Sequence, residues 1–475
     1  MKDIIKISVK CKKGGMADVK ADLLAVGIFK DAKKLSKANA LLNSKLSGAL
    51  KRLIDIGDFK GGEGESTLVY GDGKIGAARV LLVGLGESKK VTVDKLRDGA
   101  AIAAAKAVEL KAGDCVIAIH AECRGKVAME LAGRAMAEGA FVGGYRYDEF
   151  ITNNKNGRGK SLRVSIVESD DSDYILLCKG VKVGGILGQS QSFARTISNR
   201  PGNVINPPKL AEIAKKMAKG TAGLSCKVFN EAELKQKKMG GILAVGSGSK
   251  SGPRLIVLRY KGRAAKGKKL PLIGLVGKAI TFDSGGISIK PSAGMQDMKF
   301  DKSGGIAVLG AMKAIAELKP AVDVIGIIPS AENMPGGTSY RPGDIVTTYS
   351  GKTVEVQNTD AEGRMLLCDG LHYAVEQKCD RIVDIATLTG ACMVALGKYK
   401  AGLMGNDDKM IEELKKASEK SGEKVWHMPS GEEYLEEMKS KIADLKNTGS
   451  KWGGACTAAA FLGAFIGETK WAHID

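Results

Sequence analysis

The sequence predicts an α/β protein of two domains, in which mainly parallel strands alternate with helices. Three observations carry this prediction. The chain has 475 residues, about three times the usual domain size, which favours two or three domains. Hydrophobic residues make up 44% and charged residues 27%, as in ordinary globular proteins. Short apolar runs alternate with helix-forming segments, as expected for strands joined by helical crossovers.

The first part of the chain shows this alternation most clearly. Apolar runs at residues 80–83 and 115–120 predict strands, and the alanine-rich segment 95–110 between them predicts a helix. The polar stretches 152–160 and 169–173 predict exposed loops near a domain boundary.

A connecting helix and a second α/β segment follow. Apolar residues recur at helical spacing from Ile186 to Ile197, and the pattern ends before Pro201, which predicts a helix ending near Asn199. Continuous apolar runs then predict strands buried on both faces of a sheet, and glycine-rich segments follow three of them, where such sheets place ligands. These runs are residues 255–258, 272–276, 322–328 and 382–385. We therefore expect an N-terminal domain over 1–175, a connecting helix over 176–200 and a C-terminal domain over 201–475.

Composition excludes several classes of protein. No apolar stretch approaches the roughly 18 residues of a membrane helix, and the start lacks a signal-peptide core. Nine cysteines without a CxxC pair predict reduced thiols in a cytoplasm. The net charge of +20 is concentrated in residues 151–300, which leaves nucleic-acid binding open. Aromatic residues are only 5% and do not interleave the lysine clusters, so solvated lysines are the favoured interpretation.

The candidate chemistry depends on carboxylates. The four histidines are scattered without an HExxH motif, and no GxSxG motif occurs. Two glycine-rich segments, 276–301 and 358–364, are dense in ionisable groups. Within the second, Asp360 and Glu362 lie two residues apart, so in extended backbone both side chains point the same way. A pair of divalent cations would relieve their repulsion, and oxygen ligands suit manganese or magnesium, while zinc also accepts carboxylates.

An ordinary alternative exists for each of these residues. Loop carboxylates can be solvated and paired with Lys278, Lys290 and Arg364. That interpretation is favoured for any one carboxylate alone, but not for both segments together.

The two segments resemble the leucyl aminopeptidase family of cytosolic two-metal enzymes. The stretch Asn-Thr-Asp-Ala-Glu-Gly-Arg at 358–364 matches the family signature, and the segment 278–301 matches as well. The resemblance extends from about Arg195 onward, through residues 333–344, 386–390, 443–444, 457–459 and 471–475. It implies a smaller N-terminal α/β domain and a catalytic α/β domain with a central mixed, mostly parallel sheet flanked by helices.

The resemblance also implies roles for individual residues. Asp283 and Glu362 would bridge two metal ions, manganese or zinc. Asp360 would complete the looser site, while Lys278, as a neutral amine, and Asp301 would complete the tighter one. The remaining implied residues act on the substrate: Lys290 polarises the scissile carbonyl, Arg364 holds a bicarbonate general base, and Met298, Thr387 and Gly390 line the pocket for the first side chain.

The expected protein is therefore a cytoplasmic, homohexameric aminopeptidase that releases leucine-like N-terminal residues from short peptides through a water bridging two metals. A dipeptidase acting on Cys-Gly and a sequence-specific DNA-binding protein are the alternatives. Three departures from the family stand out. Lys302 replaces the usual methionine, and Ala279 replaces a glycine. Family members also continue past Asp475, which implies a truncated chain or an open pocket.

Overall fold

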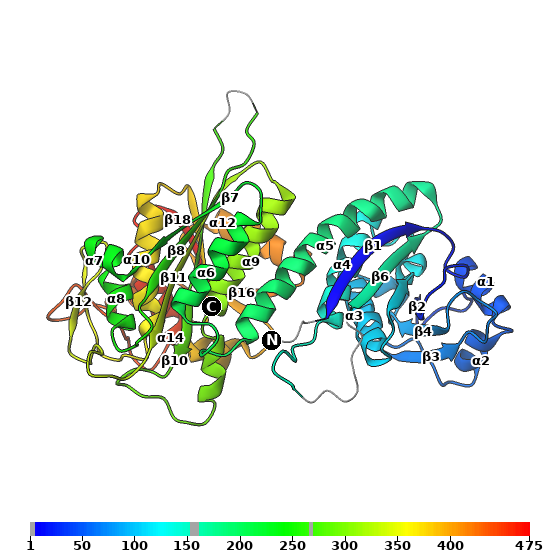
Figure 1. The fold of residues 1–475 in the computed structure, drawn as a ribbon, viewed down its shortest axis with the longest axis horizontal. Coiled ribbons are helices and arrows are strands. Elements are labelled where there is room, and N and C mark those ends of the chain that lie inside the picture. The colour runs from blue at the N-terminus through cyan, green and yellow to red at the C-terminus, as the bar shows by residue number, and fades with distance from the viewer. Residues whose placement is uncertain (1–4, 153–160, 266–268) are drawn as a thin grey trace. The chain divides into compact units, whose positions relative to one another are not determined.

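The computed structural model describes residues 5–152, 161–265 and 269–475. These residues divide into two compact units, Met1–Ser192 and Phe193–Asp475. The elements of the first unit, drawn from blue to cyan-green in Figure 1, are β1 (Lys6–Lys13), β2 (Leu23–Ile28), α1 (Lys37–Lys45), α2 (Ala49–Asp55), β3 (Ser66–Tyr70), β4 (Arg79–Gly84), η1 (Ser88–Lys90), α3 (Val93–Glu109), β5 (Asp114–Ile117), η2 (Ile119–Cys123), α4 (Met129–Gly144), β6 (Ser161–Glu168) and α5 (Asp171–Asn199).

The first unit is a three-layer α/β domain. Its six strands are ordered β1-β6-β5-β2-β4-β3, and every pair is parallel except β3 with β4. Side chains of β2 alternate between two hydrophobic clusters. Leu23 and Ala25 pack with α3, α4 and α5 on one face of the sheet, and Leu24 and Val26 pack with α1 and α2 on the other. This alternation places helices on both faces of the sheet.

Two local expectations for this unit were wrong. The run 115–120 does not remain a strand, because β5 ends at Ile117 and η2 carries the buried His120. Residues 171–173 form the first turn of α5 rather than a loop. The Asp170 carboxylate accepts a hydrogen bond from the Asp173 N–H at 3.0 Å, which satisfies a free donor of that turn. Most of the stretch 152–160 lies outside the described residues.

The helix α5 ends at Asn199 and contains the point at which the chain divides into units. The boundaries expected near residues 175 and 200 stay a prediction. The second unit continues with α6 (Pro207–Lys219), β7 (Leu224–Phe229), α7 (Glu231–Gln236), α8 (Gly240–Gly246), β8 (Arg254–Tyr260), β9 (Leu272–Gly277), β10 (Ala279–Asp283), η3 (Met295–Phe300), α9 (Ser303–Leu318), β11 (Asp323–Asn333), β12 (Ile345–Thr347), β13 (Thr353–Glu355), α10 (Glu362–Glu376), β14 (Arg381–Ile385), α11 (Gly390–Leu396), β15 (Ala401–Gly405), α12 (Asp408–Ser421), β16 (Val425–His427), α13 (Glu432–Glu436), β17 (Leu445–Lys446), α14 (Gly454–Gly463) and β18 (Lys470–Ile474).

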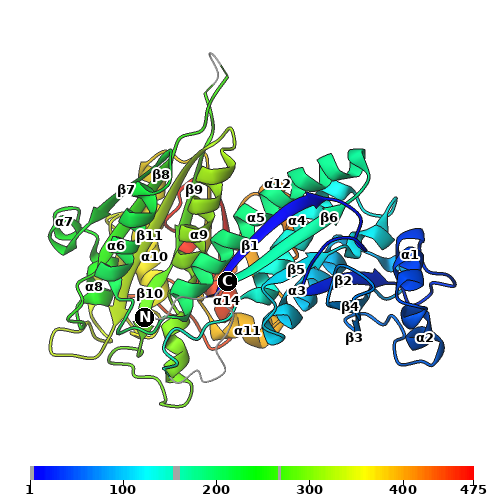
Figure 2. The ribbon, with the colours of Figure 1, turned by 45° about the vertical axis from the view of Figure 1, so that its right-hand side comes forward.

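The second unit is built on a mixed, mostly parallel sheet ordered β16-β15-β18-β14-β9-β11-β8-β7, with β10 paired to β11. Antiparallel pairs occur at β7–β8, β8–β11 and β15–β18. The helices α6 and α9 cover one face, and α8, α10 and α14 cover the other, as Figure 2 lets the reader follow. A small sheet, β12-β13-β17, lies apart from this one. The predicted α/β fold class is confirmed in both units.

None of the described helices is both long and apolar enough to span a membrane.

Candidate active site

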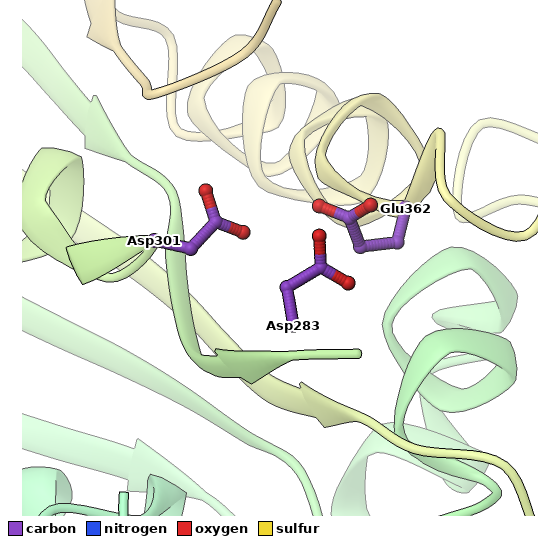
Figure 3. Close-up of side chains that lie close together, drawn as sticks. All are labelled: Asp283, Asp301 and Glu362. Carbon is purple, nitrogen blue, oxygen red and sulfur yellow. The ribbon is translucent and has the colours of Figure 1, made fainter. Parts of the chain in front are cut away.

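Three buried carboxylates meet at the carboxyl ends of β9 and β10. Asp283 is the last residue of β10, Asp301 directly follows η3, and Glu362 is the first residue of α10. One oxygen from each lies within 4.8 Å of those of the other two, and Figure 3 shows the three groups facing one another. Residues almost 80 positions apart in the sequence thus share one site.

Two lysines supply positive charge to this cluster. The Nζ atom of Lys278, which stands between β9 and β10, lies 2.8 Å from Asp301 and 2.9 Å from Glu362. The Nζ atom of Lys290 lies 2.8 Å from Asp283 and also pairs with Asp360. Four carboxylates therefore share two ammonium groups.

Burial raises the pKa values of Asp301, Asp360 and Glu362, and the neighbouring carboxylate of Asp283 adds to each shift. Burial and the neighbouring Asp283 raise the pKa of Glu362 to about 8. Burial also raises the pKa of Asp301 to about 6, although Lys278 opposes the shift. Burial alone would lower the pKa of Lys278, but the surrounding carboxylates raise it overall. The cluster is short of positive charge.

The residues present fit a pair of divalent cations. The Asp301 Oδ2 atom is buried and has no hydrogen-bond partner, so its lone pairs are available to a cation. The donor set consists of carboxylate oxygens and one amine, which suits manganese or zinc. Gly363 helps to form the set, because a Cβ atom there would come within 2.8 Å of the Lys278 Nζ and Cε atoms.

Arg364 lies in the first turn of α10 and is only 9% exposed. Its guanidinium group forms no hydrogen bond or ion pair with the described part of the chain. Burial lowers the pKa of Arg364 to about 10, and the charges of Glu362 and Asp475 oppose that shift. Arg364 is therefore a buried cation at neutral pH with donors to spare, as an anion site requires.

The three expected pocket residues occupy different surroundings. The Thr387 hydroxyl donates to Asp301 Oδ1 at 2.7 Å, and its carbonyl accepts from Lys278 Nζ at 2.8 Å. Met298 lies half-buried in η3. Gly390 begins α11, with open space where a side chain would stand. Among these three residues, Thr387 alone hydrogen-bonds to the charged cluster within the described structure.

Sequence reasoning gave no role to two residues that hold the cluster together, Asn333 and Thr359. Asn333 donates to Asp283 and to the Thr359 carbonyl. The Thr359 hydroxyl donates to the Gly285 carbonyl at 2.6 Å. Asn333 could have been identified from the sequence, because it is a polar residue at the carboxyl end of an apolar strand, where such sheets place ligands.

The α/β fold and the buried carboxylate–lysine cluster define a metal-dependent hydrolase. The chain belongs to the cytosol aminopeptidase family. The sequence profile of the family's catalytic domain matches residues 192–475, and that of its N-terminal domain matches residues 25–154.

Relatives and solved structures agree with this assignment. The chain is 43% identical over 473 residues to the probable cytosol aminopeptidase of Aquifex aeolicus (strain VF5), covering 99% of this chain and 92% of that protein. It is 40% identical over 469 residues to that of Alkaliphilus oremlandii (strain OhILAs), covering 99% and 93%. A mutant of tomato leucine aminopeptidase superposes with a TM-score of 0.88 at 35% identity, covering 100% of this chain and 92% of that one.

A second solved structure contains a metal ion. The bottromycin maturation enzyme BotP in complex with Mn superposes with a TM-score of 0.83 at 32% identity, covering 96% of this chain and 92% of that chain. The family resemblance, the two-domain architecture and the assignment as a metallo-aminopeptidase are thereby confirmed.

Proposed function

We propose that the protein releases leucine-like N-terminal residues from short peptides with two divalent metal ions, manganese or zinc. The single observation that carries the proposal is the buried triad of Asp283, Asp301 and Glu362, with oxygens within 4.8 Å of one another and too few cations beside them. The Mn complex of the structurally similar BotP supports manganese as one candidate.

Five side chains would hold the ions. Asp283 and Glu362 would bridge them, Asp360 would complete one site, and Lys278 and Asp301 would complete the other. When bound, the ions would supply a water made acidic enough to attack at neutral pH and a polarised substrate carbonyl. To act as a ligand, Lys278 gives up the proton that it holds between Asp301 and Glu362, so metal binding releases that proton.

Lys290 stabilises the oxyanion that develops on the scissile carbonyl. Burial opposes its charged form, but Asp283 and Asp360 outweigh burial and raise the pKa of Lys290. It therefore keeps its proton at neutral pH and offers a positive charge at the rim of the cluster.

Arg364 would hold a bicarbonate ion as the general base. Its buried guanidinium group, which lacks a partner among the described residues, supports this role. Met298, Thr387 and Gly390 would line the pocket for the first side chain. A homohexameric assembly and a cytoplasmic location complete the proposal.

The test uses the full chain stripped of metal and reloaded with manganese or with zinc. Leucyl, alanyl and aspartyl amides, together with an N-acetylated leucyl amide, report the preferred residue and the need for a free amine. We expect activity to return with metal, to be highest on the leucyl amide and to vanish on the blocked one. Activity that survives both stripping and the Asp360→Ala substitution would refute the proposal.

A further inference from the structure

Asn333 lies where the two segments that carry the charged cluster meet. It is the last residue of β11 and pairs with Asp283 of β10, after a shift in the register of the two strands. Its side chain is fully buried. Its carbonyl accepts two hydrogen bonds from Ser284, from N–H at 3.0 Å and from Oγ at 2.8 Å, so its backbone is fixed.

The Asn333 side chain connects both ligand-bearing segments. Its Nδ2 atom donates to Asp283 Oδ1 at 2.8 Å and to the Thr359 carbonyl at 3.0 Å. An amide nitrogen has two hydrogens, so both are used. Thr359 directly precedes Asp360 and lies three residues before Glu362.

The orientation of this amide is determined by its surroundings. A flipped amide would set its oxygen against the Asp283 carboxylate and a carbonyl, which both lack hydrogens to donate. In the observed orientation the Asn333 Oδ1 atom is buried without a hydrogen-bond partner. A buried acceptor without a partner costs free energy. The amide orientation is therefore set by the two hydrogen bonds that it donates, to Asp283 and to the Thr359 carbonyl.

Neighbouring residues strengthen the same connection. Thr359 N–H donates to Ser288 Oγ at 3.1 Å, and Ser288 N–H donates to Thr359 Oγ1 at 2.8 Å. The Tyr340 hydroxyl donates to the Thr359 carbonyl at 2.8 Å, beside the bond from Asn333. Gly286, with φ +69°, leaves room for Asn333, since a Cβ atom there would lie 2.7 Å from Oδ1.

We propose that Asn333 is a positioning residue that fixes the Asp283 carboxylate and ties it to the segment carrying Asp360 and Glu362. This inference rests on the proposed two-metal function. The Asn333 amide and the Gly285 N–H, at 3.0 Å, both donate to Asp283 Oδ1, whereas Oδ2 is the oxygen that lies 2.8 Å from Lys290 Nζ. The two ligand segments are thus aligned by hydrogen bonds within the protein itself.

The test compares Asn333→Ala and Asn333→Asp with wild type, and uses Ser330→Ala as the matched control. Ser330 is equally buried on the same strand, but its hydroxyl donates to the Ala279 carbonyl and contacts no carboxylate. Calorimetric titration of Mn²⁺ into the metal-stripped full chain measures affinity and stoichiometry. The electron paramagnetic resonance spectrum reports whether two manganese ions are coupled through a shared bridge.

We expect Asn333→Ala to bind at least one Mn²⁺ about 10–100-fold more weakly, and both variants to lose the coupled spectrum. Ser330→Ala keeps both properties of wild type. If Asn333→Ala fails to fold by circular dichroism, Asn333→Ser, a smaller change that keeps a polar group, decides the question. The inference would be overturned if folded variants bound Mn²⁺ within about twofold of the wild-type affinity and kept the coupled spectrum. A change of about twofold is far smaller than the expected loss.

The two proposals fail differently. If wild type binds no Mn²⁺ and shows no metal-dependent activity, the proposed function fails. If wild type binds two ions and is active, and the Asn333 variants match it in both, only the positioning role fails.

Discussion

Both units gather ionisable groups at the carboxyl edge of a sheet, but they balance charge in opposite ways. In the first unit one carboxylate, Glu168 at the end of β6, faces several donors. His120 Nε2 lies 3.2 Å away, Arg124 pairs with it, and the N–H groups of Ser169 and Asp170 donate to it at 2.6 and 2.8 Å. In the second unit, four carboxylates share two lysines.

The pKa values follow from this difference. Burial opposes the charged form of Glu168, yet its hydrogen bonds from His120 and Asp170 and the nearby charges lower its pKa to about 2. The pKa of Glu362 rises instead to about 8. A cluster whose donors match its charge stabilises the fold. A cluster that lacks positive charge is prepared to bind cations, at a cost to the metal-free fold.

Exchanging glutamate for glutamine in each cluster tests most directly whether the two clusters differ in role, and it has the largest expected effect. Glu362→Gln removes a proposed bridging ligand, and we expect kcat/KM on a leucyl amide to fall by about 10³-fold or more. Changes to residues that only hydrogen-bond to a metal ligand cost roughly 10–100-fold. Glu168→Gln serves as the matched control and should leave kcat/KM near wild type. Similar losses in both variants would show that the two clusters do not differ in role.

Within the second cluster, a Lys290 variant separates catalysis from metal binding, because we propose that Lys290 acts on the substrate and does not bind a metal ion. Lys290→Met removes a cation that stabilises developing negative charge, and we expect kcat to fall by about 10²–10³-fold. Metal stoichiometry, measured by atomic absorption after gel filtration, should remain that of wild type. Loss of metal together with activity would mean that Lys290 supports the metal ligands instead.

Glu168 offers a test through stability rather than activity. Glu168→Gln should lower the free energy of unfolding at pH 7 by about 2 kcal/mol, because buried donors lose a charged acceptor. The folded pKa of about 2 lies below the ordinary 4.5, so the stabilisation is complete above pH 4.5 and is lost as the pH falls toward 2.

Urea unfolding of wild type and Glu168→Gln at pH 7 and at pH 3 measures this effect. The gap between their free energies of unfolding should narrow at pH 3. A gap that is constant across this range would show that the charge of Glu168 contributes nothing.

Sequence reasoning predicted the architecture more fully than the site. The apolar runs at 272–276 and 322–328 became most of β9 and the first half of β11, because the hydrophobic pattern is sufficient to define buried strands. It could not predict that η2 would bring His120 to Glu168, since that pair depends on where two strands end in space. The role of Asn333 was not predicted for a related reason. It depends on the pairing of β11 with β10, which brings Asn333 beside Asp283.

Substitution of Lys302 has the smallest expected effect on Mn²⁺ affinity. It tests whether cations other than Lys278 and Lys290 act on the carboxylate cluster. It directly follows Asp301, yet its Nζ atom turns to backbone carbonyls, those of Ser198 and Arg200 at 2.9 Å each and that of Lys299. Its three hydrogens are therefore bound without any carboxylate. Burial lowers the pKa of Lys302 to about 8, with a smaller contribution from Lys299, so its charge is weakly retained.

Lys302→Met, the residue usual in the family, exchanges three hydrogen bonds for relief from burying a cation, and these effects largely offset each other. We expect Mn²⁺ affinity to change by less than about threefold, which is less than the loss of a hydrogen bond to a metal ligand would cause. Calorimetric titration beside wild type measures it. A gain in affinity of about tenfold would show that the Lys302 ammonium repels the ions, and that the cations acting on the cluster extend beyond Lys278 and Lys290.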